Sequence, residues 1–136
     1  MIDKTEIHSQ CKQTSLAIHD ALELLSGKWI PIIIMALLVR KNLGFAELKR
    51  EISGISSKVL SDCLKRLEQQ LVVRRKASIN QNGKVEYSLS DHGKSLEKLL
   101  KELSIVGVAH RTILTGRNAT EHTMAEFIQF GTKNDL

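Results

Sequence analysis

Residues that cross-link or interrupt a chain are scarce in this sequence. Its 136 residues include two cysteines, Cys11 and Cys63, and one proline, Pro31. Two cysteines so far apart in sequence argue against a disulfide scaffold. The most apolar run, residues 29–39, is far shorter than the roughly 20 residues of a membrane span, and a basic residue stands on either side of it. The run predicts a buried helix, and with no cleavable signal pattern at the N-terminus we expect a cytoplasmic protein.

Sequence patterns of catalytic and metal sites are also missing. The five histidines show no metal-ligand spacing, and there is no glycine-rich phosphate loop, nucleophile elbow or paired-carboxylate motif. We therefore predict a protein that is not an enzyme and that uses no metal and no cofactor. A chain of 136 residues has room for one domain with a real core and little room for a second.

The centre of the chain predicts a helix-turn-helix. Residues 45–52 carry apolar side chains at i, i+3 and i+7, which is one stripe of a short helix. Gly54 can take the positive φ of a sharp turn, Ile55 can fill the angle between two helices, and Ser56 is a good N-cap. The following helix, residues 56–70, should bury one side, because leucines recur there at i, i+4, i+7 and i+11. These leucines are Leu60, Leu64, Leu67 and Leu71.

The remaining elements follow from periodicity and from start and stop signals. We expect helices over residues 14–25, 31–39, 91–114 and 120–130, a turn at 42–44, and a hairpin of strands 72–79 and 85–89. Ser90 should cap the helix that begins at residue 91, and Gly116 should end it. The fold class is mainly α with a small β-hairpin wing, in one domain whose reading core spans about residues 44–91.

The hairpin allows two registers. A two-residue turn at Asn82-Gly83 would mix polar and apolar side chains on one face. A longer loop that pairs Ala77 with Leu89 gives a continuous apolar side, so we favour it. The tip, residues 82–84, would then project as a wing that can reach a DNA backbone or minor groove.

Positive charge gathers where the reading helix and the hairpin are expected. Residues 56–85 hold seven basic and two acidic side chains, an excess of five, and the formal net charge of the whole chain is +5. The rest of the chain therefore sums to zero. Such clustering predicts phosphate contacts to double-stranded DNA. The alternatives are a solvated basic face without a partner, or a winged-helix interaction module that binds an acidic protein.

Five stretches together resemble the HxlR-type family of bacterial winged helix-turn-helix regulators, within the MarR-like winged-helix superfamily. They read LSGKWIPIII (25–34), GFAELKR (44–50), GISSKVL (54–60), LKRLE (64–68) and VEYSLS (85–90). The resemblance covers about residues 16–103. It implies a homodimer joined through N- and C-terminal helices, about residues 14–25 and 91–114, that binds a pseudo-palindromic operator. Carried over to this chain, the recognition helix is residues 56–70 and the wing is residues 74–89.

The candidate DNA contacts fall into two groups. On the recognition helix they are Ser56, Ser57, Lys58, Ser61, Asp62 and Lys65, and on the wing Arg74, Arg75, Lys76, Asn82, Gly83 and Lys84. Lysines can reach guanine edges or phosphates, and serines can bond to either. Asp62 has two interpretations: an intrahelical ion pair with Lys58 or Arg66, or acceptance from a cytosine amino group.

A cysteine carries the prediction of regulation. Many members of the family have a cysteine just before the N-terminal helix, often followed by proline, and in some it senses electrophiles or oxidants. In this chain Ser15 occupies that place, Cys11 lies about one turn earlier, and Lys12 replaces the proline. We predict that Cys11 senses an electrophile or oxidant, the alternative being an incidental cysteine, and that Cys63 packs in the core. The effector, the operator and the target genes stay open, and a repressor is favoured over an activator.

Apolar side chains on the two terminal helices predict the dimer interface. They are Leu16, Leu22 and Leu25 on the first helix and Leu96, Leu99, Leu100, Leu103, Val106 and Ile113 on the last. A two-fold dimer would place the two recognition helices about one DNA turn apart, roughly 34 Å.

Overall fold

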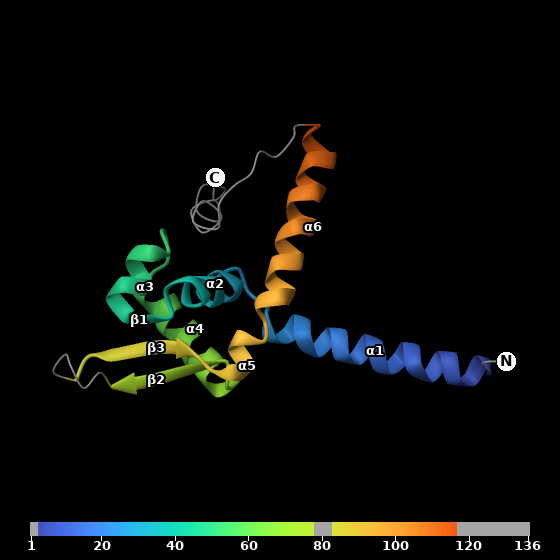
Figure 1. The fold of residues 1–136 in the computed structure, drawn as a ribbon, viewed down its shortest axis with the longest axis horizontal. Helices are drawn as coiled ribbons and strands as arrows, with labels where there is room; N and C mark the ends of the chain where they lie inside the picture. Colours follow the sequence, from blue (N-terminus) through green and yellow to red (C-terminus); the bar gives the residue numbers. More distant parts are fainter. Residues whose placement is uncertain (1–2, 78–82, 117–136) are drawn as a thin grey trace.

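The computed structural model describes residues 3–77 and 83–116 (Figure 1). Its elements run in the order α1 (Lys4–Leu24), α2 (Ile30–Arg40), β1 (Asn42–Gly44), α3 (Phe45–Glu51), α4 (Ser57–Gln69), β2 (Val73–Ala77), β3 (Val85–Leu89), α5 (Asp91–Lys94) and α6 (Glu97–Thr115). The expected mainly helical fold with a small wing is confirmed. The helix expected over residues 120–130 lies outside the described residues.

The sheet has three antiparallel strands in the order β1-β3-β2, which corrects two expectations. Residues 42–44 are not a turn but a strand, in which buried Leu43 pairs with Tyr87. In the hairpin, Ala77 pairs with Val85 and not with Leu89, so the register lies four residues from the favoured one. The actual register sets Val73 against Leu89, and the buried state of both side chains stabilises that pairing more than a short turn would.

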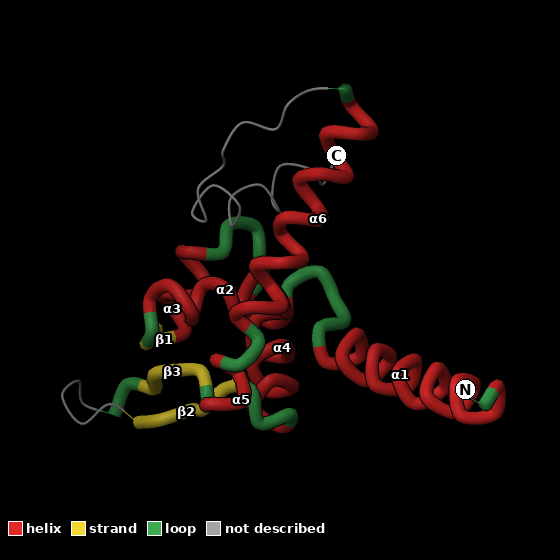
Figure 2. Tube along the Cα trace, turned by 45° about the vertical axis from the view of Figure 1, so that its right-hand side comes forward, coloured by secondary structure: helices red, strands yellow, loops and turns green. Residues whose placement is uncertain are grey.

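The core lies between α2, α3, α4 and one face of the sheet, and Leu96 and Leu100 complete it (Figure 2). α2 is buried at five positions, as its apolar run predicts. The fourth leucine of the α4 stripe is an exception: Leu71 is 73% exposed and has a φ of +62°. The helix has already ended at Gln69, so the chain reverses at Leu71 and Val72 takes the buried place.

α1 begins ten residues before its expected start. Asp3 caps it, because its side chain accepts a hydrogen bond from the Thr5 N–H. The residues it adds are mostly polar, so apolar periodicity did not reveal them. No residue of α1 is buried, and the helix projects away from the rest of the fold (Figure 1).

The helix expected over residues 91–114 is divided into α5 and α6. Ser90 caps α5 as expected, accepting a hydrogen bond from the Gly93 N–H, and Gly116 ends α6 with a φ of +66°. The division at Ser95 and Leu96 turns Leu96 into the core, where it is 8% exposed. α6 then leaves the body in its own direction (Figure 2). Within the described residues, no helix has the length and apolarity that crossing a membrane would require.

Candidate nucleic-acid interface

The predicted recognition helix, α4, has one buried and one exposed side. Leu60, Leu64 and Leu67 are at most 2% exposed, and they fix the helix against the core. The opposite side exposes the predicted contact residues Lys58, Ser61, Asp62 and Lys65. The structure therefore brings together on one surface the polar residues that the sequence placed there.

The N-terminus of α4 is built by the turn that precedes it. Gly54 has a φ of +89°, and Ile55 is buried at 4% exposure between the helices. The Ser56 Oγ accepts a hydrogen bond from the Val59 N–H at 3.2 Å, which confirms the N-cap. Ser57 is exposed in the first turn. The positive end of the helix dipole and these hydroxyl groups form a surface suited to a phosphate.

Asp62 makes no ion pair with a described residue, although both candidate partners lie on its own helix. Arg66 is directed away from it and donates hydrogen bonds to the backbone and side chain around Ser26. The intrahelical ion pair is therefore not formed here. An exposed carboxylate without a cation remains able to accept a hydrogen bond from a base.

The wing residues do not share one face. Because side chains alternate along a strand, Arg74 and Lys76 lie on one side of β2, and Arg75 lies on the side of buried Val73. All three side chains nevertheless line a hollow of about 720 Å³, together with Glu68 and Glu86. The two carboxylates partly offset the positive charge at the base of the wing.

The tip of the wing is described in part. Gly83 has a φ of +78°, a left-handed conformation that glycine adopts at no steric cost. Lys84 is exposed beside it. Asn82 lies outside the described residues.

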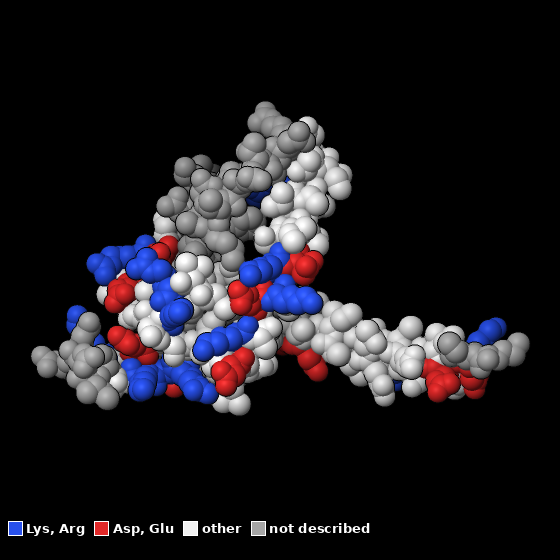
Figure 3. Space-filling view, viewed as in Figure 1, with Lys and Arg blue, Asp and Glu red and all other residues white. Residues whose placement is uncertain are grey.

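Basic residues outside the two groups of predicted DNA contacts lie on and beside α3. Lys49 and Arg50 are exposed in its last turn, and Lys41 is exposed just before β1. Figure 3 shows Lys and Arg side chains over α3 as well as along the sheet. The first helix of a helix-turn-helix crosses the DNA backbone, so these residues extend the candidate interface. Lys49 and Arg50 occupy polar positions of the helix predicted over residues 45–52, whereas Lys41 lies outside that range.

Sequence and structure comparisons agree with this geometry. The family model for HxlR-like helix-turn-helix proteins matches residues 24–113. The chain belongs to this family. It is 36% identical over 103 residues to the HTH-type transcriptional regulator YdzF of Bacillus subtilis, which covers 76% of this chain and 94% of YdzF.

Solved structures give the same fold. The reduced form of the redox regulator HypR superposes with a TM-score of 0.65 at 27% identity, covering 74% of this chain and 99% of HypR. The reduced form of the transcriptional regulator YodB from B. subtilis gives 0.59 at 28% identity, covering 77% and 90%. The chain is thus a transcriptional regulator of the HxlR type, with a DNA-binding helix-turn-helix.

The two cysteines of this HxlR-type chain lie in different environments. Cys11 is exposed and lies inside α1, not before it as expected. Helical spacing sets it on the same face as Ile7, Ile18 and Leu22. Cys63 packs against the core as predicted, and burial raises the pKa of its thiol, an effect that the nearby Arg66 partly opposes.

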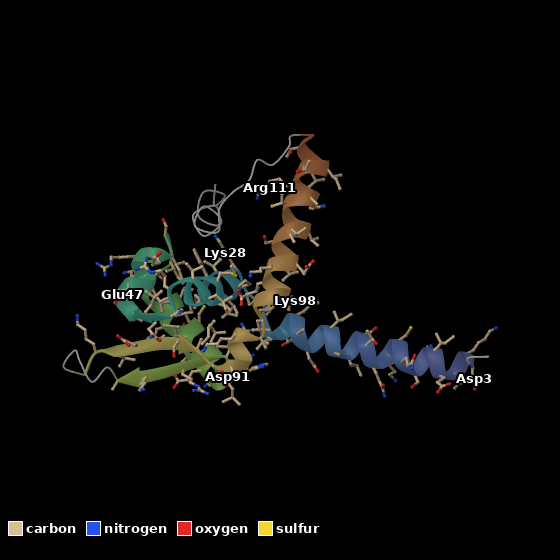
Figure 4. All side chains as sticks on the ribbon, in the orientation of Figure 1. Asp3, Lys28, Glu47, Asp91, Lys98 and Arg111 are labelled. Carbon is tan, nitrogen blue, oxygen red and sulfur yellow. The ribbon has the colours of Figure 1, made fainter. Side chains whose placement is uncertain are left out.

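The predicted dimer residues divide into two groups. Leu25, Leu96 and Leu100 pack into the core of their own chain, which corrects their assignment to an interface. The others are exposed on α1 and α6, together with residues that were not predicted. The exposed residues are Ile7, Leu16, Ile18 and Leu22 on α1 and Leu99, Leu103, Ile105, Val106, Ile113 and Leu114 on α6. Figure 4 shows side chains extending into solvent along α1, towards the labelled Asp3, and along α6, around the labelled Arg111.

Proposed function

We propose that this HxlR-type regulator is a homodimeric repressor that reads a two-fold symmetric DNA operator with α4. The observation that carries the proposal is the outer side of α4, where Lys58 and Lys65 stand exposed opposite three buried leucines. A helix fixed in this way presents its polar side chains at constant positions, as major-groove recognition requires.

Within that interface we assign separate roles. Lys58, Ser61, Asp62 and Lys65 read base edges or adjacent phosphates, and Ser56 and Ser57 hold a phosphate at the N-terminus of α4. Lys84, with Asn82 and Gly83, approaches the backbone from the tip of the wing. Arg74, Arg75 and Lys76 contribute at longer range, since carboxylates share the hollow beside them.

The dimer is supported by apolar surface that the single chain leaves exposed. Ile18 and Leu22 on α1 are 56% and 60% exposed, and Val106 on α6 is 62% exposed. Both helices project from the body, so a second copy can cover them without displacing the core (Figure 1). Two-fold pairing would set the two α4 helices about one DNA turn apart, roughly 34 Å.

We further propose that modification of Cys11 by an oxidant or electrophile lowers DNA affinity. Cys11 is exposed in the single chain and lies on the apolar face that the dimer would cover, so an adduct there would alter how the subunits meet. HypR, a redox regulator, is a precedent for such an input. The test is operator binding before and after diamide, in the parent, Cys11→Ser and Cys63→Ser proteins. Unchanged affinity in the treated parent would refute the proposal.

Selection of DNA by the purified protein tests the reading function. We expect genomic fragments from the source organism to be enriched in one inverted-repeat sequence, with binding that weakens steeply as salt rises. A reporter gene placed behind that sequence should be expressed less when the regulator is present. Binding with no sequence enrichment, and equal competition by unrelated DNA, would favour the alternative of an interaction module with an acidic protein partner.

A further inference from the structure

Arg66 links the recognition helix to the far end of a helix that is distant in sequence. Its Nη2 donates hydrogen bonds to the Glu23 carbonyl oxygen at 2.7 Å and to the Ser26 Oγ at 2.8 Å. Its Nη1 donates to the Ser26 carbonyl oxygen at 3.0 Å. One side chain of α4 thus engages three acceptors at the C-terminus of α1 and in the turn that follows it.

The carbonyl groups at the end of α1 can accept more hydrogen bonds than the local backbone supplies. The Glu23 carbonyl oxygen accepts one from the Ser26 N–H at 3.2 Å, and its second lone pair can accept another. The last carbonyl groups of a helix lack intrahelical partners and carry partial negative charge, and the last turn of α1 contains no basic residue. The guanidinium of Arg66 supplies both the donors and the positive charge from another helix. Its fork matches two carbonyl groups and a hydroxyl group, and charged donors make stronger bonds than neutral ones.

Within residues 3–77 and 83–116, few other contacts hold α1 to the body. The helix has no buried residue, and of the described residues at its root, Leu24 and the adjoining Leu25 pack partly against the core. Its 21 residues extend for about 32 Å at 1.5 Å per residue, so a change of about 10° at the root would move its far end by about 5 Å. The direction of α1 therefore depends strongly on the few contacts at its root.

We propose that Arg66 is a positioning residue that fixes the angle between α1 and the recognition helix. The inference rests on the proposed function, in which α1 joins the subunits and α4 reads DNA. A fixed angle between them sets the separation of the two recognition helices in the dimer. Arg66 thereby affects binding to two half-sites at once without touching a base.

The position of Arg66 on α4 fits this role. It stands one residue beyond Lys65, at the flank between the exposed side and the buried leucines, and it is half-buried. All three of its hydrogen bonds lead back to α1 and the turn after it. A residue that contacts phosphate would instead direct its guanidinium outwards, beside Lys58 and Lys65.

The test compares two DNA probes. One is a duplex carrying two inverted half-sites, selected by the parent protein from a random library, and the other is the same duplex with one half-site scrambled. We expect the parent to prefer the intact duplex by roughly 100-fold, as avidity allows. In Arg66→Ala the preference should fall roughly tenfold, while affinity for the single half-site changes less than about twofold. Changing the spacing between half-sites by one or two base pairs should also affect Arg66→Ala less than the parent.

Two further variants separate position from charge and from folding. Arg66→Lys keeps the positive charge but lacks the forked N–H donors of the guanidinium. It should lose the preference for the intact duplex, as Arg66→Ala does. Ser26→Ala removes one acceptor at a place remote from the outer side of α4, and it should lose part of the preference. Lys94→Ala, which removes an exposed charge from α5, is the matched control and should keep the parental ratio.

The outcomes are distinguishable. A parent with no preference for two half-sites would contradict the proposed dimeric function itself. A parental ratio in Arg66→Ala, or full recovery in Arg66→Lys, would overturn the positioning role alone. Equal loss on both probes would also overturn it, by showing a direct DNA contact or a damaged fold. Circular dichroism melting of Arg66→Ala, compared with the parent, separates these last two causes.

Discussion

The hydrophobic core and α1 place the same types of apolar residue in opposite environments. In α2, Ile33, Ile34 and Leu37 are at most 1% exposed, whereas Ile18 and Leu22 of α1 are more than half exposed. The core covers its apolar side chains with other parts of the same chain. The described residues leave the apolar side chains of α1 exposed, and this is the surface that the proposed dimer would cover.

The same contrast holds for polar contacts. The α3 end of the core is joined by an ion pair of 2.9 Å between Arg40 and Glu51, and Ser90 bonds to the carbonyl groups of Leu71 and Val72. At α1, the hydrogen bonds described to another helix are those from Arg66. Among the described contacts, the core is joined by hydrogen bonds and ion pairs from several elements, whereas α1 is joined mainly at its root.

The largest expected effect is a loss of stability when a buried leucine is truncated, compared with the same truncation of an exposed leucine on α6. Leu67→Ala should lower the free energy of unfolding by about 3 kcal/mol, since Leu67 is fully buried and a cavity would remain. Leu103→Ala, at a site 46% exposed on α6, should change it by less than about 0.5 kcal/mol in the dissociated chain and should weaken the dimer. Urea denaturation and sedimentation at several concentrations measure the two effects. Equal losses of stability would show that α6 belongs to the core.

Lysines on the outer side of α4 should affect DNA binding without affecting the fold. Lys58→Ala or Lys65→Ala should cost roughly 1–3 kcal/mol of binding if the lysine contacts a base, with relaxed preference at one position. A phosphate contact would instead weaken binding to all sequences and reduce the salt dependence. Fluorescence anisotropy on the selected operator at several salt concentrations distinguishes these results. If both variants bind like the parent, α4 is not the recognition helix.

A smaller gain in stability should follow from relieving backbone strain at Leu71, just after α4. Leu71→Gly should raise the free energy of unfolding by roughly 0.5–1 kcal/mol, because glycine takes the positive φ without the cost that leucine has there. The side chain is 73% exposed, so little burial is lost. Leu71→Ala removes the same side chain and keeps the strain, so its stability should match the parent. A less stable Leu71→Gly would show that the leucine makes a stabilising contact.

The smallest expected effect is a difference in alkylation rate between the two cysteines. Burial raises the pKa of Cys63, so at a given pH a smaller fraction of its thiol is the reactive thiolate. Iodoacetamide at pH 8 should therefore modify Cys63 in the Cys11→Ser protein several-fold more slowly than Cys11 in the Cys63→Ser protein. Mass spectrometry of timed samples gives both rates. Faster reaction at Cys63 would place the accessible thiol on α4 and not on α1.

The sequence by itself determined the helices of the core and their ends. Leucine spacing gave α4 its buried side, and Ser56, Ser90 and Gly116 act as the caps and stop that were predicted. These features are local, because they depend on residues within one or two turns of one another. The polar side of α4, and so its part of the candidate interface, followed from the same spacing.

The tertiary structure alone decided which distant segments meet. β1 forms because β3 offers an edge on which Leu43 can be buried, and the register of β2 follows from the burial of Val73 against Leu89. Likewise, the sequence near Arg66 contains Asp62 as an obvious partner, yet Arg66 bonds to Glu23 and Ser26. Such pairings depend on how packed elements approach one another, and short-range spacing carries no information about that approach.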